Sequence, residues 1–190
     1  AVLANADYAH VETELLDPAD CSYPRRYWES RVTAPSMFLL YLGVKQRLER
    51  LAHHNLYFQE DWNVHFDTIF KRPAWPADPC FYVSCITKTD PDMAPPGCEN
   101  VFVLVPVAAG LEDSDAVRAD YAGEVIRHVE RITGEEIAPH VEVQRIFSPR
   151  DFARDYHAWK GTALGISHTL LQTAIFRPAM SSHTASTARL

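Results

Sequence analysis

The residues best suited to chemistry gather in the stretch 156–178, near the end of the chain. Lys160 and His168 supply groups that can take up a proton. Gly161 and Gly165 leave the backbone bare, so a flat molecule can approach it closely. These features favour a wall against which a planar ligand can lie.

Two common kinds of active site do not fit this stretch. Ser167 precedes His168, but the segment lacks the G-x-S-x-G pattern of a nucleophile elbow, which argues against hydrolase chemistry. The glycines are spaced G-x-x-x-G, unlike the G-x-G-x-x-G of a dinucleotide fingerprint, and no acidic residue follows Gly165. By itself, the stretch is therefore not expected to hold a pyrophosphate.

The other polar clusters do not indicate a metal site. The four cysteines are separated by gaps unlike the short C-x2-C pairs of zinc sites. His53 and His54 are adjacent, and neighbours on a strand point to opposite faces. The acidic loop 88–100 lacks the regular ligand series of an EF-hand. We expect no metal ligands, and we expect reduced thiols with Cys85 buried in a strand.

The composition is that of a globular domain. The 190 residues are 47% hydrophobic and 23% charged, which suffices for one sizeable core. A net charge of −7 argues against nucleic-acid binding, which needs a basic surface. The apolar runs at 37–42 and 101–109 are shorter than the roughly 20 residues that span a bilayer.

Strand patterns predict the sheet that must position these residues. The continuous apolar run at 37–44 is typical of a strand buried on both faces. Further strands are predicted at 54–59, 81–87, 101–107 and 141–147, and a short buried one at 2–6.

Helix signals complete the predicted fold. Asp7 is a predicted cap for a helix over 8–16, and Ser114 for one that ends at Gly134. Ser148 is the predicted cap of another helix, with Pro149 at its first position. A helix over 62–70 is expected to turn Phe66, Ile69 and Phe70 inward, and 21–35 fits a loop or an irregular helix. The predicted class is α+β, with a mixed, mostly antiparallel sheet of about five strands and helices packed on one face.

Several segments together resemble the bacterial-type phytoene desaturases, which are FAD-dependent carotenoid dehydrogenases. The most specific are GTALGISHTLLQTAIFRP at 161–178 and the T-D-P-x-x-A-P-x-G loop at 89–97. VLANAD at 2–7, FLLYLGV at 38–44 and RIFSPRDF at 145–152 occur in the order that the family has.

The resemblance implies an internal fragment of a two-domain flavoprotein whose dinucleotide fingerprint lies upstream. It implies three parts: a strand and helix of the flavin-domain edge at 1–20, a substrate-binding domain at 21–178, and a linker at 179–190 toward a C-terminal flavin segment. The fragment alone is expected to be inactive and to hold no FAD.

For the parent protein, the resemblance implies an oxidoreductase of carotenoid biosynthesis. It would introduce double bonds into a long polyisoprenoid, with FAD as the hydride acceptor. The alternatives are a carotenoid isomerase or ketolase of the same superfamily, or a non-enzymatic module that binds apolar ligands. Since such a substrate dissolves in the bilayer, a cytoplasmic protein at the membrane surface is expected, with 21–35 as a candidate contact.

The resemblance also suggests roles for particular residues. His168 and Lys160 are candidate catalytic proton acceptors, and Gly161, Gly165 and Arg177 are placed beside the flavin. Because a polyisoprenoid is an apolar rod, its tunnel should be lined mainly by apolar side chains of the strands. The expected substrate contacts are Phe38, Leu40, His54, Tyr57, Phe81, Val83, Phe102, Leu104, Gln172 and Phe176.

Overall fold

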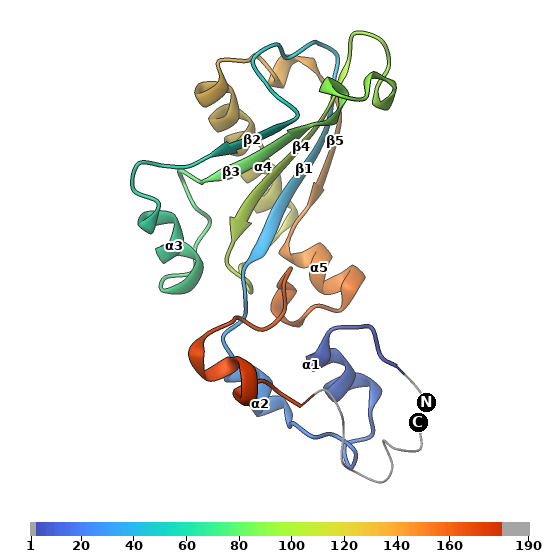
Figure 1. Cartoon of the computed structure of the whole chain (residues 1–190), viewed down its shortest axis with the longest axis vertical. Coiled ribbons are helices and arrows are strands. Elements are labelled where there is room, and N and C mark those ends of the chain that lie inside the picture. The colour runs from blue at the N-terminus through green and yellow to red at the C-terminus, as the bar shows by residue number, and fades with distance from the viewer. Residues whose placement is uncertain (1–2, 180–190) are drawn as a thin grey trace.

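A five-stranded antiparallel sheet forms the centre of the structure, a computed structural model that describes residues 3–179 (Figure 1). Its strands follow the order β2-β3-β4-β1-β5, and every neighbouring pair is antiparallel. This confirms the predicted α+β class. The strands are β1 (Ser36–Val44), β2 (His54–Tyr57), β3 (Phe81–Cys85), β4 (Glu99–Val107) and β5 (Val141–Phe147).

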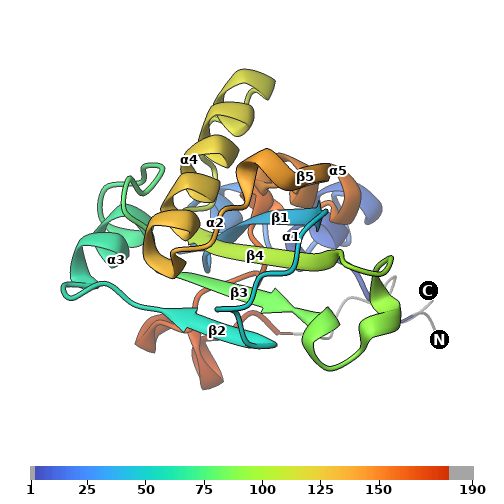
Figure 2. The ribbon, with the colours of Figure 1, turned by 90° about the horizontal axis from the view of Figure 1, so that it is seen from above.

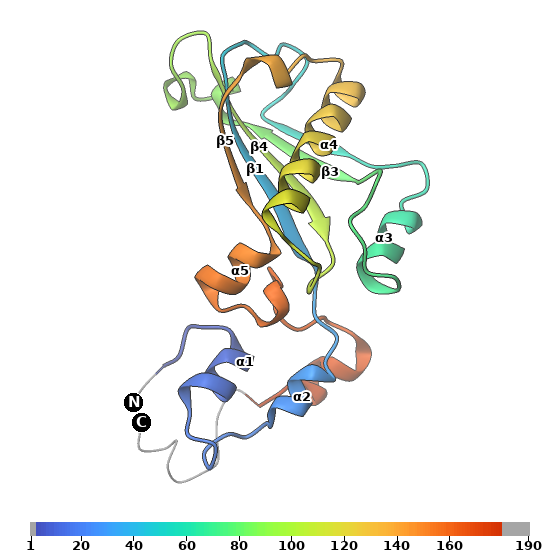
Figure 3. The same cartoon turned by 180° about the vertical axis from the view of Figure 1, so that it is seen from behind.

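The hydrophobic core lies between this sheet and the long helix α4 (Asp115–Thr133). Leu40 of β1 pairs with Val103 of β4, and both are at most 1% exposed. Val125 of α4 belongs to the same buried cluster. Figures 2 and 3 show α4 against one face of the sheet, while no helix of residues 3–179 lies across the other face.

The ends of α4 follow their predicted signals. The Ser114 hydroxyl accepts a hydrogen bond from the Val117 N–H at 3.3 Å. Gly134 closes the helix in the left-handed conformation with φ of 70°, which glycine adopts without steric conflict.

Residues 3–179 also contain four shorter α-helices: α1 (Tyr8–His10), which continues as a π-helical turn over Val11–Leu15, α2 (Arg25–Glu29), α3 (Asn63–Phe70) and α5 (Pro149–Tyr156). Asp7 caps α1 as predicted, because its carboxylate accepts from the His10 N–H at 3.1 Å. The segment 21–35 thus contains a helix of one turn and a half between irregular stretches.

Two sequence predictions are corrected by the structure. Residues 3–6 form no strand, and Leu3 is 94% exposed, because no strand of residues 3–179 lies beside them to complete a ladder. In α3, Ile69 is buried as predicted, but Phe66 and Phe70 are 47% and 45% exposed.

The orientation of α3 is set by a buried histidine. His65 is 3% exposed, and its ring contacts the Pro106 carbonyl at 2.7 Å and accepts from the Cys80 N–H at 3.0 Å. Burial lowers the pKa of His65, so the neutral ring with its proton on Nε2 satisfies both partners. This polar anchor turns the aromatic residues of α3 outward.

Below the sheet, segments far apart in the sequence form a second unit (Figure 1). The Ala34 N–H donates to the Gly165 carbonyl at 2.8 Å, and the Ser167 N–H donates to the Val32 carbonyl at 2.9 Å. The stretch 32–35 is therefore tied to the glycine-containing stretch 161–178. We call residues 7–35 and 157–179 the lower unit.

Candidate functional site

The face of the sheet opposite α4, named the open face, carries mainly apolar and aromatic side chains, with Arg145 of β5 opposite Tyr41. Successive residues of a strand point to opposite sides, so the neighbours of the core residues lie here. Tyr41 pairs with Phe102, with ring centroids 5.2 Å apart, and Tyr41 remains 42% exposed. The open face also carries Leu39, Tyr82, Leu104 and Phe147.

A groove of about 660 Å³ lies on the open face. Strands β1 and β5 form its floor, the loop between β3 and β4 forms a wall, and α5 contributes Tyr156. Its size and apolar lining suit a small apolar ligand or part of a longer one. The apolar lining includes Tyr41, Gly43, Met93, Pro95, Val143 and Phe147.

One buried carboxylate fixes both ends of the loop that walls the groove. The Glu99 side chain is fully buried and pairs with Lys88 at 2.9 Å and Arg47 at 3.2 Å. Burial alone would raise the pKa of Glu99, but hydrogen bonds from Thr87, Lys88 and Cys85 outweigh it and lower that pKa. Glu99 is therefore a charged anchor of the groove wall.

Four of the predicted substrate contacts lie in the core. Phe38, Leu40, Phe81 and Val83 are between 0% and 3% exposed and belong to the cluster beneath α4. Packing is their observed role, and contact with a substrate stays a prediction for them.

The other four predicted strand contacts are divided between the two faces. Phe102 and Leu104 lie on the open face, across from β1. His54 lies at the β2 edge of the same face, where its Nδ1 is 2.6 Å from the Tyr82 hydroxyl. Tyr57 lies on the core side and stacks on Phe81.

The two glycines predicted to lie beside a flavin differ in their surroundings. Both have positive φ, 67° at Gly161 and 77° at Gly165. A Cβ at Gly161 would lie 2.2 Å from the Pro149 carbonyl oxygen, whereas a Cβ at Gly165 would meet nothing within 4 Å. Gly161 thus allows the backbone at Pro149 to pass close to it, whereas the space beside the Gly165 α-carbon is open.

Gln172 ties the lower unit together. Its amide oxygen accepts from the Val32 N–H at 2.8 Å, and its amide nitrogen donates to the carbonyls of Val32 and Ser167. The Gln172 side chain is buried and its observed role is this bridge, whereas Phe176 is 55% exposed. Substrate contact stays a prediction for both residues.

The predicted proton acceptors do not share a cavity. Lys160 lines a cavity of about 470 Å³ with His10 and His157. Gly165 and Arg177 line a different cavity of about 290 Å³. His168 is exposed, and its Nε2 lies 3.1 Å from the Arg177 guanidinium. The structure therefore brings His168 and Arg177 together, and within residues 3–179 neither of them contacts Lys160.

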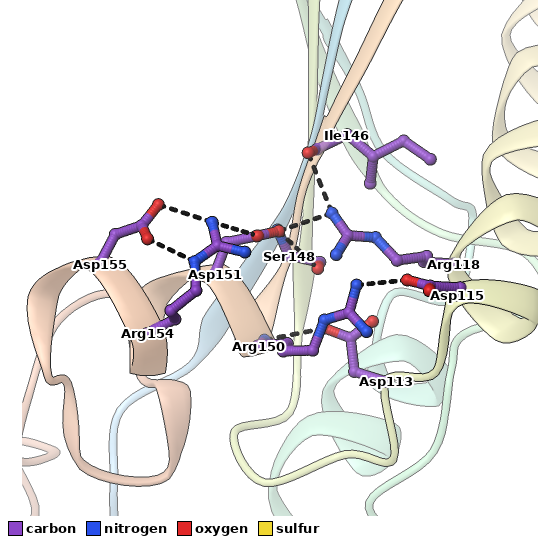
Figure 4. Close-up of polar contacts among 9 residues, drawn as sticks. All are labelled: Asp113, Asp115, Arg118, Ile146, Ser148, Arg150, Asp151, Arg154 and Asp155. Carbon is purple, nitrogen blue, oxygen red and sulfur yellow. Dashed lines mark hydrogen bonds and ion pairs between the residues drawn. The ribbon is translucent and has the colours of Figure 1, made fainter.

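A network of charged side chains holds α5 between the sheet and the lower unit (Figure 4). The Asp151 carboxylate accepts from the Arg118 guanidinium at 2.6 Å and from the Ser148 backbone N–H at 3.0 Å. Arg118 also donates to the Ile146 carbonyl at 3.0 Å, which joins α4 to β5. Since Pro149 begins α5 and meets Gly161, this network also positions the glycine stretch.

The sequence predictions missed the residues of the open face that line the groove. Tyr41 and Gly43 fall in a continuous apolar run, which conceals the alternation between the faces. The signal that could have found them is the alternation of a strand, because Tyr41 and Gly43 must lie on the face opposite Phe38 and Leu40. Which face is open depends on where α4 packs.

Among residues 3–179, no group of three or more His, Cys, Asp or Glu side chains is placed to hold a metal ion. In the same part of the chain, every helix is too short or too polar to traverse a bilayer.

The chain is similar in sequence to several carotenoid and phytoene desaturases. It is 46% identical over 177 residues to a carotenoid 3,4-desaturase of Haloarcula japonica, across 93% of this chain and 36% of the relative. It is 35% identical to a zeta-carotene-forming phytoene desaturase of Myxococcus xanthus, across 94% of this chain and 35% of the relative. The chain is homologous to one segment of the carotenoid desaturases. A lycopene-forming phytoene desaturase of Paracoccus is 32% identical over 181 residues.

This homology confirms the family resemblance predicted from the sequence, although no protein-family model matches the chain. The chain spans about a third of the length of these carotenoid desaturases. The open face, the groove and the lower unit therefore belong to a segment that carotenoid desaturases contain.

Proposed function

We propose that the chain is the substrate-side part of an FAD-dependent carotenoid desaturase, and that a polyisoprenoid lies along its open face. The observation that carries this proposal is an apolar, aromatic sheet face with a groove, in a chain homologous to carotenoid desaturases. Burial of apolar surface supplies about 25 cal/mol per Å², so a long hydrocarbon gains affinity from such a face without polar contacts.

The flavin-domain edge, expected at 1–20, is extended in this proposal to the whole lower unit, because hydrogen bonds join 32–35 to 161–178. The sheet with α4 remains the proposed substrate domain. Gly165 and Arg177 fit a place beside the flavin, because a Cβ at Gly165 meets nothing and Arg177 is exposed. Gly161 fits less well, because the Pro149 carbonyl occupies the space beside it. FAD bound in the parent would accept the hydride, while residues of this chain would orient the polyisoprenoid.

Proton removal is assigned to His168 in this proposal. Its imidazole is exposed and contacts Arg177, which lines a cavity together with Gly165. Lys160 lines a separate cavity and is the weaker candidate. The proposed linker role of 179–190 falls almost entirely outside the described residues.

Association with the cytoplasmic surface of a membrane is also proposed for the parent protein. The exposed aromatic residues Phe66 and Phe70 of α3, with Trp62 just before it, support a contact with lipid, since aromatic side chains favour the membrane interface. In the segment 21–35, by contrast, Trp28 is only 1% exposed.

An assay of the full-length protein tests this function. Incubated with FAD and phytoene in liposomes, it should form products with longer conjugated chains and absorption at longer wavelengths. His168→Gln should lower the rate at least tenfold, as expected for loss of a general base, and Lys160→Gln should change it less. Phytoene that is bound but chemically unchanged would instead support an apolar carrier.

A further inference from the structure

Gly43 is the only glycine within the five described strands. Glycine inside a strand weakens it, because it has the most conformational freedom to lose and no side chain to pack. Gly43 is absent from the residues with positive φ, so its backbone conformation does not require glycine. The reason for a glycine here must lie in the space around it.

That space is the floor of the groove. On the open face, Gly43 follows Tyr41 along β1 and pairs with Val143 of β5. An added Cβ would lie 3.2 Å from the Val143 Cβ, and the three nearest atoms all belong to Val143. The position therefore tolerates a small side chain with slight movement of Val143, and a large one would have to rise into the groove.

The pairing of β1 with β5 is also irregular at this point. Gly43 pairs with Val143 but Val44 pairs with Val141, so the register shifts by one residue beside the groove. Bulges of this kind change the direction in which side chains point and are frequent next to active sites. Both the glycine and the bulge thus lie where the floor of the groove is formed.

The groove extends along β5, from Phe147 to Glu142. At about 3.3 Å per residue, this distance is roughly 17 Å, and Gly43 lies beside its second half. Resting on the proposed function, we infer that Gly43 is a specificity-determining residue: its missing side chain lets a long apolar chain continue past Tyr41. A bulky residue at position 43 would shorten the groove and leave its first half intact.

Displacement of the apolar dye Nile red from the 190-residue chain tests this inference. Squalene serves as a long isoprenoid and geraniol as a short one. Gly43→Leu should raise the squalene concentration for half-displacement at least tenfold and leave that for geraniol within twofold. Gly43→Ala should give a smaller rise for squalene. Adding Val143→Ala to Gly43→Ala should restore displacement by squalene, because the second change removes the Val143 γ-methyl groups and lets the remaining Cβ move aside.

Two results would overturn the inference: unchanged displacement by squalene in Gly43→Leu, or equal losses for squalene and geraniol in a folded variant. If Gly43→Leu does not fold, as judged by circular dichroism, the two alanine variants decide the matter. Failure of the unsubstituted chain to bind either isoprenoid would instead count against the proposed function.

Discussion

Replacing Gly161 by alanine should lower the free energy of unfolding by about 3 kcal/mol. Gly161 has φ of 67°, a conformation that costs an alanine about 1 kcal/mol. Its Cβ would also lie 2.2 Å from the Pro149 carbonyl oxygen. Backbone atoms cannot rotate aside, so α5 or the glycine stretch must move, and overpacking of this kind costs about 2 kcal/mol.

Gly165→Ala is the matched control for this prediction. Gly165 has φ of 77°, close to that of Gly161, but a Cβ there meets nothing within 4 Å. The control should therefore lower the free energy of unfolding by only about 1 kcal/mol, which is the cost of a positive φ for alanine. Thermal unfolding measures both variants, and equal losses would show that contact with Pro149 does not constrain Gly161.

Asp151→Asn should have a comparably large effect, about 3 kcal/mol. The substitution leaves the Arg118 guanidinium, which is 11% exposed, without its carboxylate partner. It also removes a charged acceptor from the Ser148 N–H at the start of α5. Removing one member of a buried pair is costly because the remaining charge has no compensation.

The pH dependence of stability gives a second measure of Asp151. Burial alone would raise the pKa of this carboxyl, but hydrogen bonds from Arg118 and Ser148 and the Arg118 charge lower it. Its contribution is therefore present above the unfolded-state pKa of about 3.9 and is lost as the pH falls below it.

Denaturant unfolding at several pH values tests both statements. Asp151→Asn should lower stability at pH 7 and should reduce the loss of stability between neutral and acidic pH. Asp155→Asn, on the same helix at an exposed site, should leave the midpoint near that of the unsubstituted chain. Unchanged stability of Asp151→Asn at pH 7 would contradict the role of the network shown in Figure 4.

Local sequence signals predicted much of the fold, because helix caps and strand bounds depend mainly on residues that are close in sequence. Ser148, Pro149 and Asp151 form the capping box expected from their order, and β5 has the predicted bounds of 141–147. Such elements are determined by neighbours in sequence. The strand predicted at 2–6 failed because a strand also needs a partner, and none lies beside residues 3–6.

The candidate site was less predictable because it depends on distant contacts. The apolar run at 37–44 indicates a strand but does not show which residues face α4. Phe38 and Leu40, the predicted contacts, lie in the core, and Tyr41 and Gly43 line the groove. Likewise, G-x-x-x-G spacing does not reveal that Pro149 closes over Gly161 and leaves Gly165 open.

Photolabelling tests most directly whether the open face binds the polyisoprenoid. The 190-residue chain would be irradiated with a small apolar diazirine, with and without excess phytoene in detergent, and the labelled peptides mapped by mass spectrometry. We predict labelling on peptides containing Tyr41, Phe102 and Phe147, and its suppression by phytoene. Labelling of these peptides that phytoene leaves unchanged, with suppression confined to other surfaces, would contradict the proposed binding face.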